Sequence, residues 1–278
     1  MPNLITSEAQ LRAYIPNIIA SVKGETPLIE RIAHFLDLAE SWVKSTFTGE
    51  DLFISVCNGD LPGLHAPLSA LVIADAMRRA IPSLDVMLTP NGFAVVNTSN
   101  LVPASKPRID RLTDSMLSHR DDCISTVLKE LPKVVSWCDS YQAHFFAATL
   151  FPDLAIVDSV GGATGSKWDR YLELRQQVID QEASLAEEWL SPELMAALRS
   201  EILNGMLTVK RSRLVREVKA QIVGFLRNGS FNSRRLADIV NYIRLNADDF
   251  KEWHASKTAE LFSPPVFRNT KASKGYFF

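Results

Sequence analysis

The chain has 278 residues, a formal net charge of −2, and 46% hydrophobic and 22% charged residues. That length suits one large or two small domains, and the composition is ordinary for a globular protein. The charge excludes a chain that is basic throughout, and no apolar run approaches the roughly 18 residues of a membrane span. Three cysteines without a close pair exclude a disulfide framework and fit a reducing compartment. The opening residues lack the pattern of a signal peptide, so we expect none.

The first half of the chain is dominated by helix patterns. Ser7 and Gln10 have the spacing of a capping box at the start of a first helix. Apolar residues recur at helical spacing in longer segments, which predict helices over residues 27–47, 64–81, 102–131 and 134–150. We expect Pro82 to end the second of these helices, because proline has no amide hydrogen with which to continue it.

One segment, residues 85–96, predicts β structure. Strand-forming residues lie on both sides of a Pro-Asn-Gly turn at residues 90–92, as in a β-hairpin. Because an isolated hairpin is marginally stable in water, we expect it to lie against the helices before and after it. If the chain assembles with copies of itself, Phe93 and Val95 on the exposed edge of the hairpin are candidate contacts with an adjacent subunit.

The second half is almost purely helical. A glycine-rich stretch at 159–166 predicts a boundary, and residues 153–158 before it form a short strand or the start of a loop. Apolar periodicity predicts helices over residues 168–189, 192–203, 206–227 and 233–253. Each half contains a long amphipathic helix followed by further helices, but no fixed sequence period shows, so we do not predict an internal repeat.

These patterns predict a mainly α protein: a multi-helix bundle with one small β-hairpin inserted near residues 85–96 and an extended C-terminal arm. The expected domains are an N-terminal helical domain with the hairpin at 1–158, a C-terminal helical domain at 166–262 and the arm at 263–278.

No segment carries a catalytic motif. The glycine-rich run at 161–165 lacks the Lys-Ser/Thr ending of a phosphate-binding loop, and no Gly-x-Ser-x-Gly elbow occurs. The five histidines are scattered and there is no Cys-x-x-Cys pair. We therefore predict no metal site, no cofactor and no enzymatic activity.

The strongest charge feature is the predicted helix at 206–227, which holds six Lys and Arg residues against a single Glu. The segment 173–201 before it holds seven acids against two Arg residues. The two segments can pair with one another or be solvated, or they can form a charge dipole across a subunit for head-to-tail contacts or for facing DNA. A nucleic-acid-binding helical protein is the alternative function. The candidate partner-binding residues are Lys210, Arg211, Arg213, Arg216 and Lys219.

The predicted arm holds two prolines, small polar residues and several aromatic residues. Aromatic side chains are unfavourable in water because of their large apolar area. They either fold back onto this chain or dock on a partner, and the sequence leaves both alternatives open. The candidate partner-binding residues of the arm are Phe267, Tyr276, Phe277 and Phe278.

Two parts of the sequence resemble known families. Residues 4–11, Leu-Ile-Thr-Ser-Glu-Ala-Gln-Leu, with Ala-Glu-Ser-Trp at 39–42 in the following helix, resemble the opening of head-to-tail adaptor proteins of tailed phages. Residues 88–96 and 103–106, with the ending at 269–278, are similar to a family of functionally unassigned proteins from Bacteroides-type phages and prophages. The adaptors are usually far shorter, so the second helical half departs from their pattern.

The resemblance implies a structural virion protein, a head-to-tail connector that forms a ring in the phage neck between portal and tail. It implies a homo-oligomer whose partners are the portal and the tail or neck proteins, with DNA passing through the channel and no membrane. The protein would be located in the virion neck, and in the host cytoplasm before assembly. The resemblance assigns no role to an individual residue.

Overall fold

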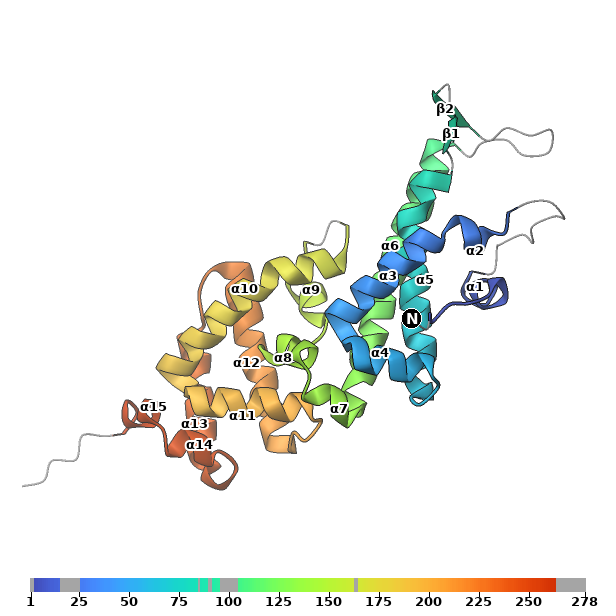
Figure 1. Cartoon of the computed structure of the whole chain (residues 1–278). Coiled ribbons are helices and arrows are strands. Elements are labelled where there is room, and N and C mark those ends of the chain that lie inside the picture. The colour runs from blue at the N-terminus through green and yellow to red at the C-terminus, as the bar shows by residue number, and fades with distance from the viewer. Residues whose placement is uncertain are drawn as a thin grey trace, which may run out of the picture.

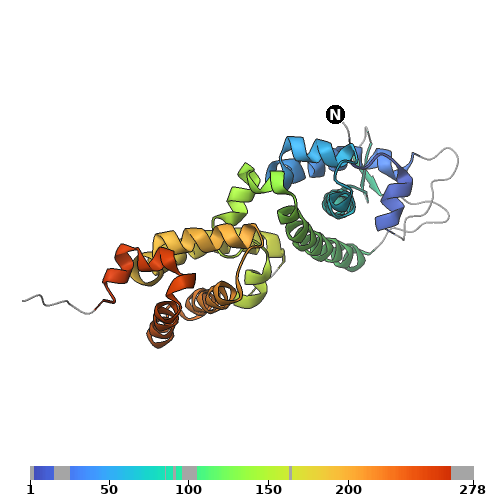
Figure 2. The same cartoon turned by 90° about the horizontal axis from the view of Figure 1, so that it is seen from below.

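The computed structural model describes residues 3–15, 26–84, 105–162 and 165–263, together with the backbone of residues 86–89 and 92–95. Its helices form two groups, one from each half of the chain (Figure 1 and Figure 2). The protein is mainly α, as predicted. Within these ranges, no helix combines the length and the apolar character that crossing a membrane requires.

Local sequence signals start many of these helices. Ser7 precedes α1 (Glu8–Tyr14) and forms the predicted capping box with Gln10. At other helix starts, the side chain of a Ser, Thr or Asn residue accepts a hydrogen bond from a backbone N–H that has no partner within the helix. These residues are Ser140, Ser166, Ser191, Thr208, Asn232 and Ser256.

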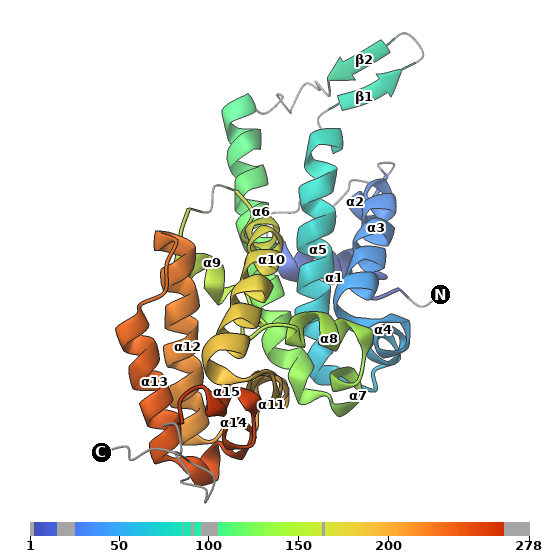
Figure 3. The ribbon, with the colours of Figure 1, turned by 90° about the vertical axis from the view of Figure 1, so that its left-hand side faces the viewer.

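The first group is built around α5 (Pro62–Leu84), which packs against α3 and along α6 (Figure 3). Buried residues lie on several sides of α5, so it needs cover from more than one helix. Besides α1 and α5, the group contains α2 (Leu28–Arg31), α3 (Ala33–Val43), a π-helical turn (Lys44–Thr48), α4 (Glu50–Cys57), α6 (Lys106–Glu130), a 3-10 turn (Leu131–Lys133), α7 (Val135–Cys138) and α8 (Tyr141–Ala147).

The second group repeats this order of helical elements, except that it has no separate counterpart of α2. A short helix is followed by a long helix with a π-helical turn at its end, three further helices, a 3-10 turn and two short helices. They are α9 (Ala155–Val160), α10 (Lys167–Leu185), the π-helical turn (Ala186–Leu190), α11 (Pro192–Leu203), α12 (Val209–Asn228), α13 (Ser233–Leu245), the 3-10 turn (Ala247–Asp249), α14 (Lys251–His254) and α15 (Lys257–Glu260). We name residues 3–147 the first repeat and residues 150–262 the second repeat.

Equivalent hydrogen bonds support this correspondence. The indole of Trp137 donates to the carbonyl of Phe47 in the first π-helical turn (2.6 Å), and the indole of Trp253 donates to the carbonyl of Trp189 in the second (2.8 Å). Both π-helical turns end at a residue with positive φ. The remaining equivalent bonds run from Gln142 to the Ser45 carbonyl (3.3 Å) and from Thr258 to the Glu187 carbonyl (3.5 Å), and the positive φ angles are 75° at Gly49 and 70° at Ser191.

A buried glutamate occupies the same place in each repeat. Glu40 accepts a hydrogen bond from the Leu4 N–H (2.8 Å), and Glu182 accepts one from the Leu150 N–H (2.7 Å). Burial raises the pKa of both carboxyl groups, and these backbone hydrogen bonds oppose that rise. The spacing from each glutamate to its π-helical turn is identical, so the chain is an internal duplication, contrary to our expectation from the sequence.

The prediction of a bundle with a β-hairpin inserted in it needs correction, because no sheet belongs to the helical body in the part of the chain described. Strands β1 (Val86–Thr89) and β2 (Gly92–Val95) pair antiparallel with each other alone. They lie beyond the ends of α5 and α6, and not along these helices (Figure 1 and Figure 3). The second repeat joins the corresponding helices by a short turn after Asn228, so this β segment is an excursion in one connection.

Other element boundaries also differ from the predicted ones. Pro82 does not end α5, which continues to Leu84. Residues 153–158 do not form a strand: Asp153 and Leu154 lie in a turn, and α9 begins at Ala155, whose N–H donates a hydrogen bond to the Asp153 carboxylate (3.0 Å). The helix predicted over 134–150 is interrupted before Ser140, and the one over 233–253 ends at Leu245. The predicted domain limits stay a prediction; α9 packs against α10 and α12.

Candidate functional site

An aromatic cluster joins the two repeats. Trp168, at the start of α10, lies among aromatic rings of the first repeat, with centroids 5.3 Å from Phe47, 6.2 Å from Trp42 and 6.3 Å from Phe146. Phe47 and Phe146 are fully buried. Tilted and edge-on ring pairs at these distances are favourable, and the apolar area they bury adds to the stabilisation. The start of α10 therefore docks the second repeat on the first.

A polar network continues this junction. Buried Arg120 on α6 contacts the Asp121 carboxylate (3.0 Å) and donates to the Ser166 hydroxyl (2.6 Å). Asp121 also accepts a hydrogen bond from the Lys167 N–H (2.6 Å), where a carboxylate suits the positive end of the α10 dipole. Arg120 lies 3.7 Å from Asp75 of α5 as well. The network thus ties α5 and α6 to the beginning of α10.

The rim of the junction is a groove of about 300 Å³. Tyr141 and Leu172 line it and are 81% and 41% exposed. Arg175 of α10 lies over the ring of Phe145, 3.9 Å from its centroid, and donates to the Phe145 carbonyl (2.9 Å). Both repeats contribute to this groove, which also exposes aromatic surface.

The second repeat carries the same aromatic cluster. The ring of Phe262 lies 5.6 Å from Trp189 and 6.0 Å from Trp253. The corresponding distances from Phe146 in the first repeat are 5.8 Å to Phe47 and 6.4 Å to Trp137. The two clusters therefore have similar ring spacings, although the Phe47–Phe146 pair is stacked (15°) and the Trp189–Phe262 pair is tilted (40°).

The two clusters differ in their cover among the described residues. Phe47 and Phe146 have no exposed surface, whereas Trp189 and Phe262 are only half-buried. Leu261 holds the position next to Phe262 that Phe145 holds next to Phe146, and it is 71% exposed. The aromatic cluster of the second repeat therefore resembles the surface on which Trp168 docks in the first repeat, but no described residue covers it in the same way.

The predicted basic helix forms as α12, and some of its cations form ion pairs with acids of the second repeat. Arg211 is buried and forms ion pairs with Glu201 and Glu252. Burial alone would raise the pKa of Glu252, but its hydrogen bonds with Arg211 lower that pKa. Lys210 pairs with Asp249 (2.6 Å). Pairing between neighbouring helices, one of the alternatives from the sequence, therefore accounts for these two cations.

The remaining three of the five predicted cations, Arg213, Arg216 and Lys219, lie in different environments. Arg213 lies over the ring of Tyr242 on α13, 4.8 Å from its centroid. Arg216 is exposed, and Lys219 lies over the ring of Phe151 (5.0 Å), where burial lowers its pKa. The structure thus does not gather the five residues into one patch, and their role in partner binding stays a prediction.

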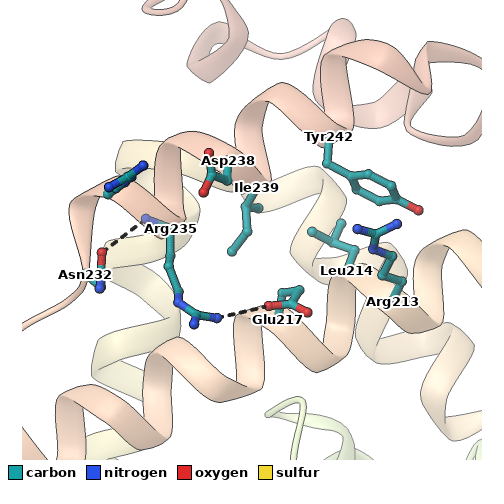
Figure 4. Close-up of a pocket in the computed structure, with 9 residues that line it drawn as sticks. Arg213, Leu214, Glu217, Asn232, Arg235, Asp238, Ile239 and Tyr242 are labelled. Carbon is teal, nitrogen blue, oxygen red and sulfur yellow. Dashed lines mark hydrogen bonds and ion pairs between the residues drawn. The ribbon is translucent and has the colours of Figure 1, made fainter.

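A groove of about 470 Å³ lies between α12 and α13. Figure 4 shows Arg213 and Tyr242 at one end of it and Asn232 at the other, with Arg235 reaching toward Glu217 (4.0 Å). The α13 arginines were missed in the sequence because charge was counted within one helix at a time. Counting basic residues on consecutive amphipathic helices together would have found them.

Some predicted site residues cannot be placed. The arm residues Phe267, Tyr276, Phe277 and Phe278 lie outside the described residues, and so do the side chains of Phe93 and Val95. In the ranges that the structure describes, no three His, Cys, Asp or Glu side chains come together as metal ligands.

Comparison with known proteins adds one finding. Neither a curated protein nor a solved structure matches the chain. Residues 16–146 match the model of a family described as a family of unknown function (DUF6712). This match ends where the first repeat ends and does not include the second. The first repeat, but not the second, is therefore similar to a family of unassigned function.

Proposed function

We propose that the protein is a non-enzymatic assembly protein that associates with copies of itself and serves as a head-to-tail connector in a phage neck. The observation that carries self-association is the half-buried cluster of Trp189 and Phe262 with exposed Leu261 beside it. The equivalent surface of the first repeat is a docking surface within the chain. Leu261 and the partly exposed rings of Trp189 and Phe262 form one contiguous apolar surface, and contiguous apolar surface is a feature of interaction sites.

The virion setting of this proposal rests on the resemblance of residues 4–11 and 39–42 to phage adaptors. Those adaptors are far shorter than this chain, and the duplication gives a physical account of the extra length, since each chain carries two similar helical units. The proposed partners are other copies in a ring, the portal, and tail or neck proteins. The proposed location is the virion neck, and the host cytoplasm before assembly.

Self-association is tested by measuring the mass of the purified full chain over a wide concentration range by sedimentation velocity. We expect species larger than a monomer, and rings in electron micrographs of the chain alone or mixed with portal protein. Deleting residues 264–278 is expected to impair assembly without changing the circular dichroism of the helical body. A full chain that stays monomeric and does not bind portal would contradict the proposal, whereas normal assembly of the truncated chain would contradict only a role for the arm.

A second candidate function is binding to nucleic acid, and the α12–α13 groove favours it. The positive charge on the exposed surface of α12 and α13 comes mainly from arginine. The two helices hold two acids, Glu217 and Asp238, and their one exposed lysine, Lys210, is paired with Asp249. Arginine suits a phosphate backbone because its planar guanidinium forms bidentate hydrogen bonds with phosphate. The exposed arginines are Arg213, Arg234 and Arg235, which line the groove, and Arg216, Arg227 and Arg244, which do not.

Replacing Arg234 and Arg235 by Glu is expected to weaken binding to a DNA duplex by at least about tenfold and to reduce the slope of log affinity against log salt by about two. Both side chains are exposed, so the fold should tolerate the change. The control is the pair Arg108→Glu and Arg111→Glu on α6, which changes net charge equally. Fluorescence anisotropy between about 50 and 200 mM salt is the measurement. Absence of binding at low salt, or an equal loss with the control pair, would remove this candidate.

A further inference from the structure

We infer that the aromatic cluster of the second repeat receives the residues 26–33 segment of a second copy, in the way that the cluster of the first repeat receives the start of α10. The contact would join successive subunits through the same kind of interface that joins the two repeats. This inference rests on the self-association proposed above and names the two surfaces that meet.

The receiving surface is defined by its likeness to an occupied one. In the first repeat, Trp168 packs on Phe47 and Phe146, and Arg175 covers Phe145. The matching positions in the second repeat hold Trp189, Phe262 and Leu261. The ring distances within the two clusters agree closely, as described above, so the second cluster offers a partner an aromatic surface of similar spacing. The proposed occupant contains the short helix α2 in place of the first turns of α10.

The occupant follows from the same correspondence. The segment that covers the first cluster belongs to the second repeat, so the segment to cover the second cluster is its first-repeat counterpart. Counted back from the buried glutamates Glu40 and Glu182, Thr26 corresponds to Trp168 and Ala33 to Arg175. Thr26 and Ala33 are both exposed, and Leu28 and Ile29 between them are half-buried. Leu28 and Ile29 pack partly on the core of their own chain, so the free surface of this segment is formed by Thr26, Glu30, Arg31 and Ala33.

Such a contact has a definite symmetry. It joins different surfaces of two copies, so every row of subunits has one unused surface of each kind at its ends. Such a row either closes on itself into a ring, in which every surface is used, or continues to grow as an open filament. A ring is the form that the connector proposal requires.

The test uses one charged substitution on each surface of the full chain. Leu261→Asp and Ala33→Asp, each alone, are expected to weaken self-association by at least about tenfold, because a charge would be buried against an apolar partner. Val135→Asp is the control: Val135 is 81% exposed and lies on neither surface. It should associate like the unmodified chain. All three positions are exposed, and circular dichroism checks that the variants fold.

Mixing the two variants gives a readout that general destabilisation would not produce. Each variant retains one intact surface, so an equimolar mixture is expected to form one-to-one pairs and nothing larger. A mixture that stays monomeric would overturn the pairing of these two surfaces. Unchanged association of Leu261→Asp would overturn the inference and leave the proposed function standing. That outcome is expected if residues 264–278 of the same chain cover the cluster. An unmodified chain that never associates would instead contradict the proposed function itself.

Discussion

Replacing Asp75 by alanine is expected to lower the free energy of unfolding by about 3–5 kcal/mol, because removing one member of a buried ion-pair network leaves the remaining charges poorly compensated. Asp75 is fully buried and contacts Arg78 (3.0 Å), Arg79 (2.6 Å) and Arg120 (3.7 Å). Without its carboxylate, three guanidinium groups remain close together, and that of Arg120 is itself buried. Urea denaturation followed by circular dichroism measures the loss.

The matched control is Asp114→Ala, which removes an exposed acid from α6 and should change stability by no more than about 0.5 kcal/mol. Asp75→Asn separates charge from shape, and we expect it to lose most of the same free energy, because Asp121 then remains beside Arg120 alone and Arg78 and Arg79 lose the carboxylate that they contact. A loss below about 1 kcal/mol for Asp75→Ala would mean that water or other acids satisfy the arginines, and that the network does not hold α5 and α6.

Replacing Trp168 by alanine is expected to cost about 3–5 kcal/mol as well, through lost burial and the cavity that remains among the rings. The side chain is 5% exposed and contacts aromatic residues of both repeats, including Tyr171 at 5.7 Å. Neighbours on α3 and α8 belong to separate helices, so they cannot easily close the space. Denaturation must be measured at high dilution, because association would add its own stabilisation.

Tyr141→Ala is the control for this change, since Tyr141 lines the adjacent groove but is 81% exposed. We expect it to cost no more than about 0.5 kcal/mol. If Trp168→Ala were equally mild, the polar network of Arg120, Asp121 and Ser166 would be the main link between the repeats.

Much of the helical structure could be predicted because its signals are local. Ser7 with Gln10, and Ser191 before Pro192, mark helix starts within a few residues. Mainly α character follows from apolar periodicity in the same way. The interrupted helices were harder, because the break before Ser140 depends on a cap that competes with a continuous apolar pattern.

The duplication was hidden because the visible sequence match has the wrong register. Leu-Ala-Glu-x-Trp occurs at 38–42 and again at 185–189, which sets Trp42 against Trp189. The indole hydrogen bonds and the π-helical turns instead set Phe47 against Trp189. The repeats share backbone geometry and buried hydrogen bonds to backbone carbonyls. Side chains of different size, such as Phe47 and Trp189, can occupy equivalent positions in that geometry.

The charge patch could not be resolved from the sequence because its partners are distant. Glu252 forms an ion pair with Arg211, although Glu252 belongs to α14 and Arg211 to α12. A count along one helix sees only the surplus of cations and not the acids that tertiary packing brings to them. The same limit hid Asp75, whose arginine neighbours include Arg120 on another helix.

The covalent connection between the repeats gives their contact a property that contacts between chains lack. Two units joined by a short connection meet at an effective concentration on the order of millimolar, whatever the protein concentration. In the proposed assembly, dilution would therefore separate subunits but not the two halves of one subunit, and Trp168 would stay on the first aromatic cluster throughout. Each free subunit then offers one open cluster and not two. In the proposed assembly, successive subunits would therefore all point the same way.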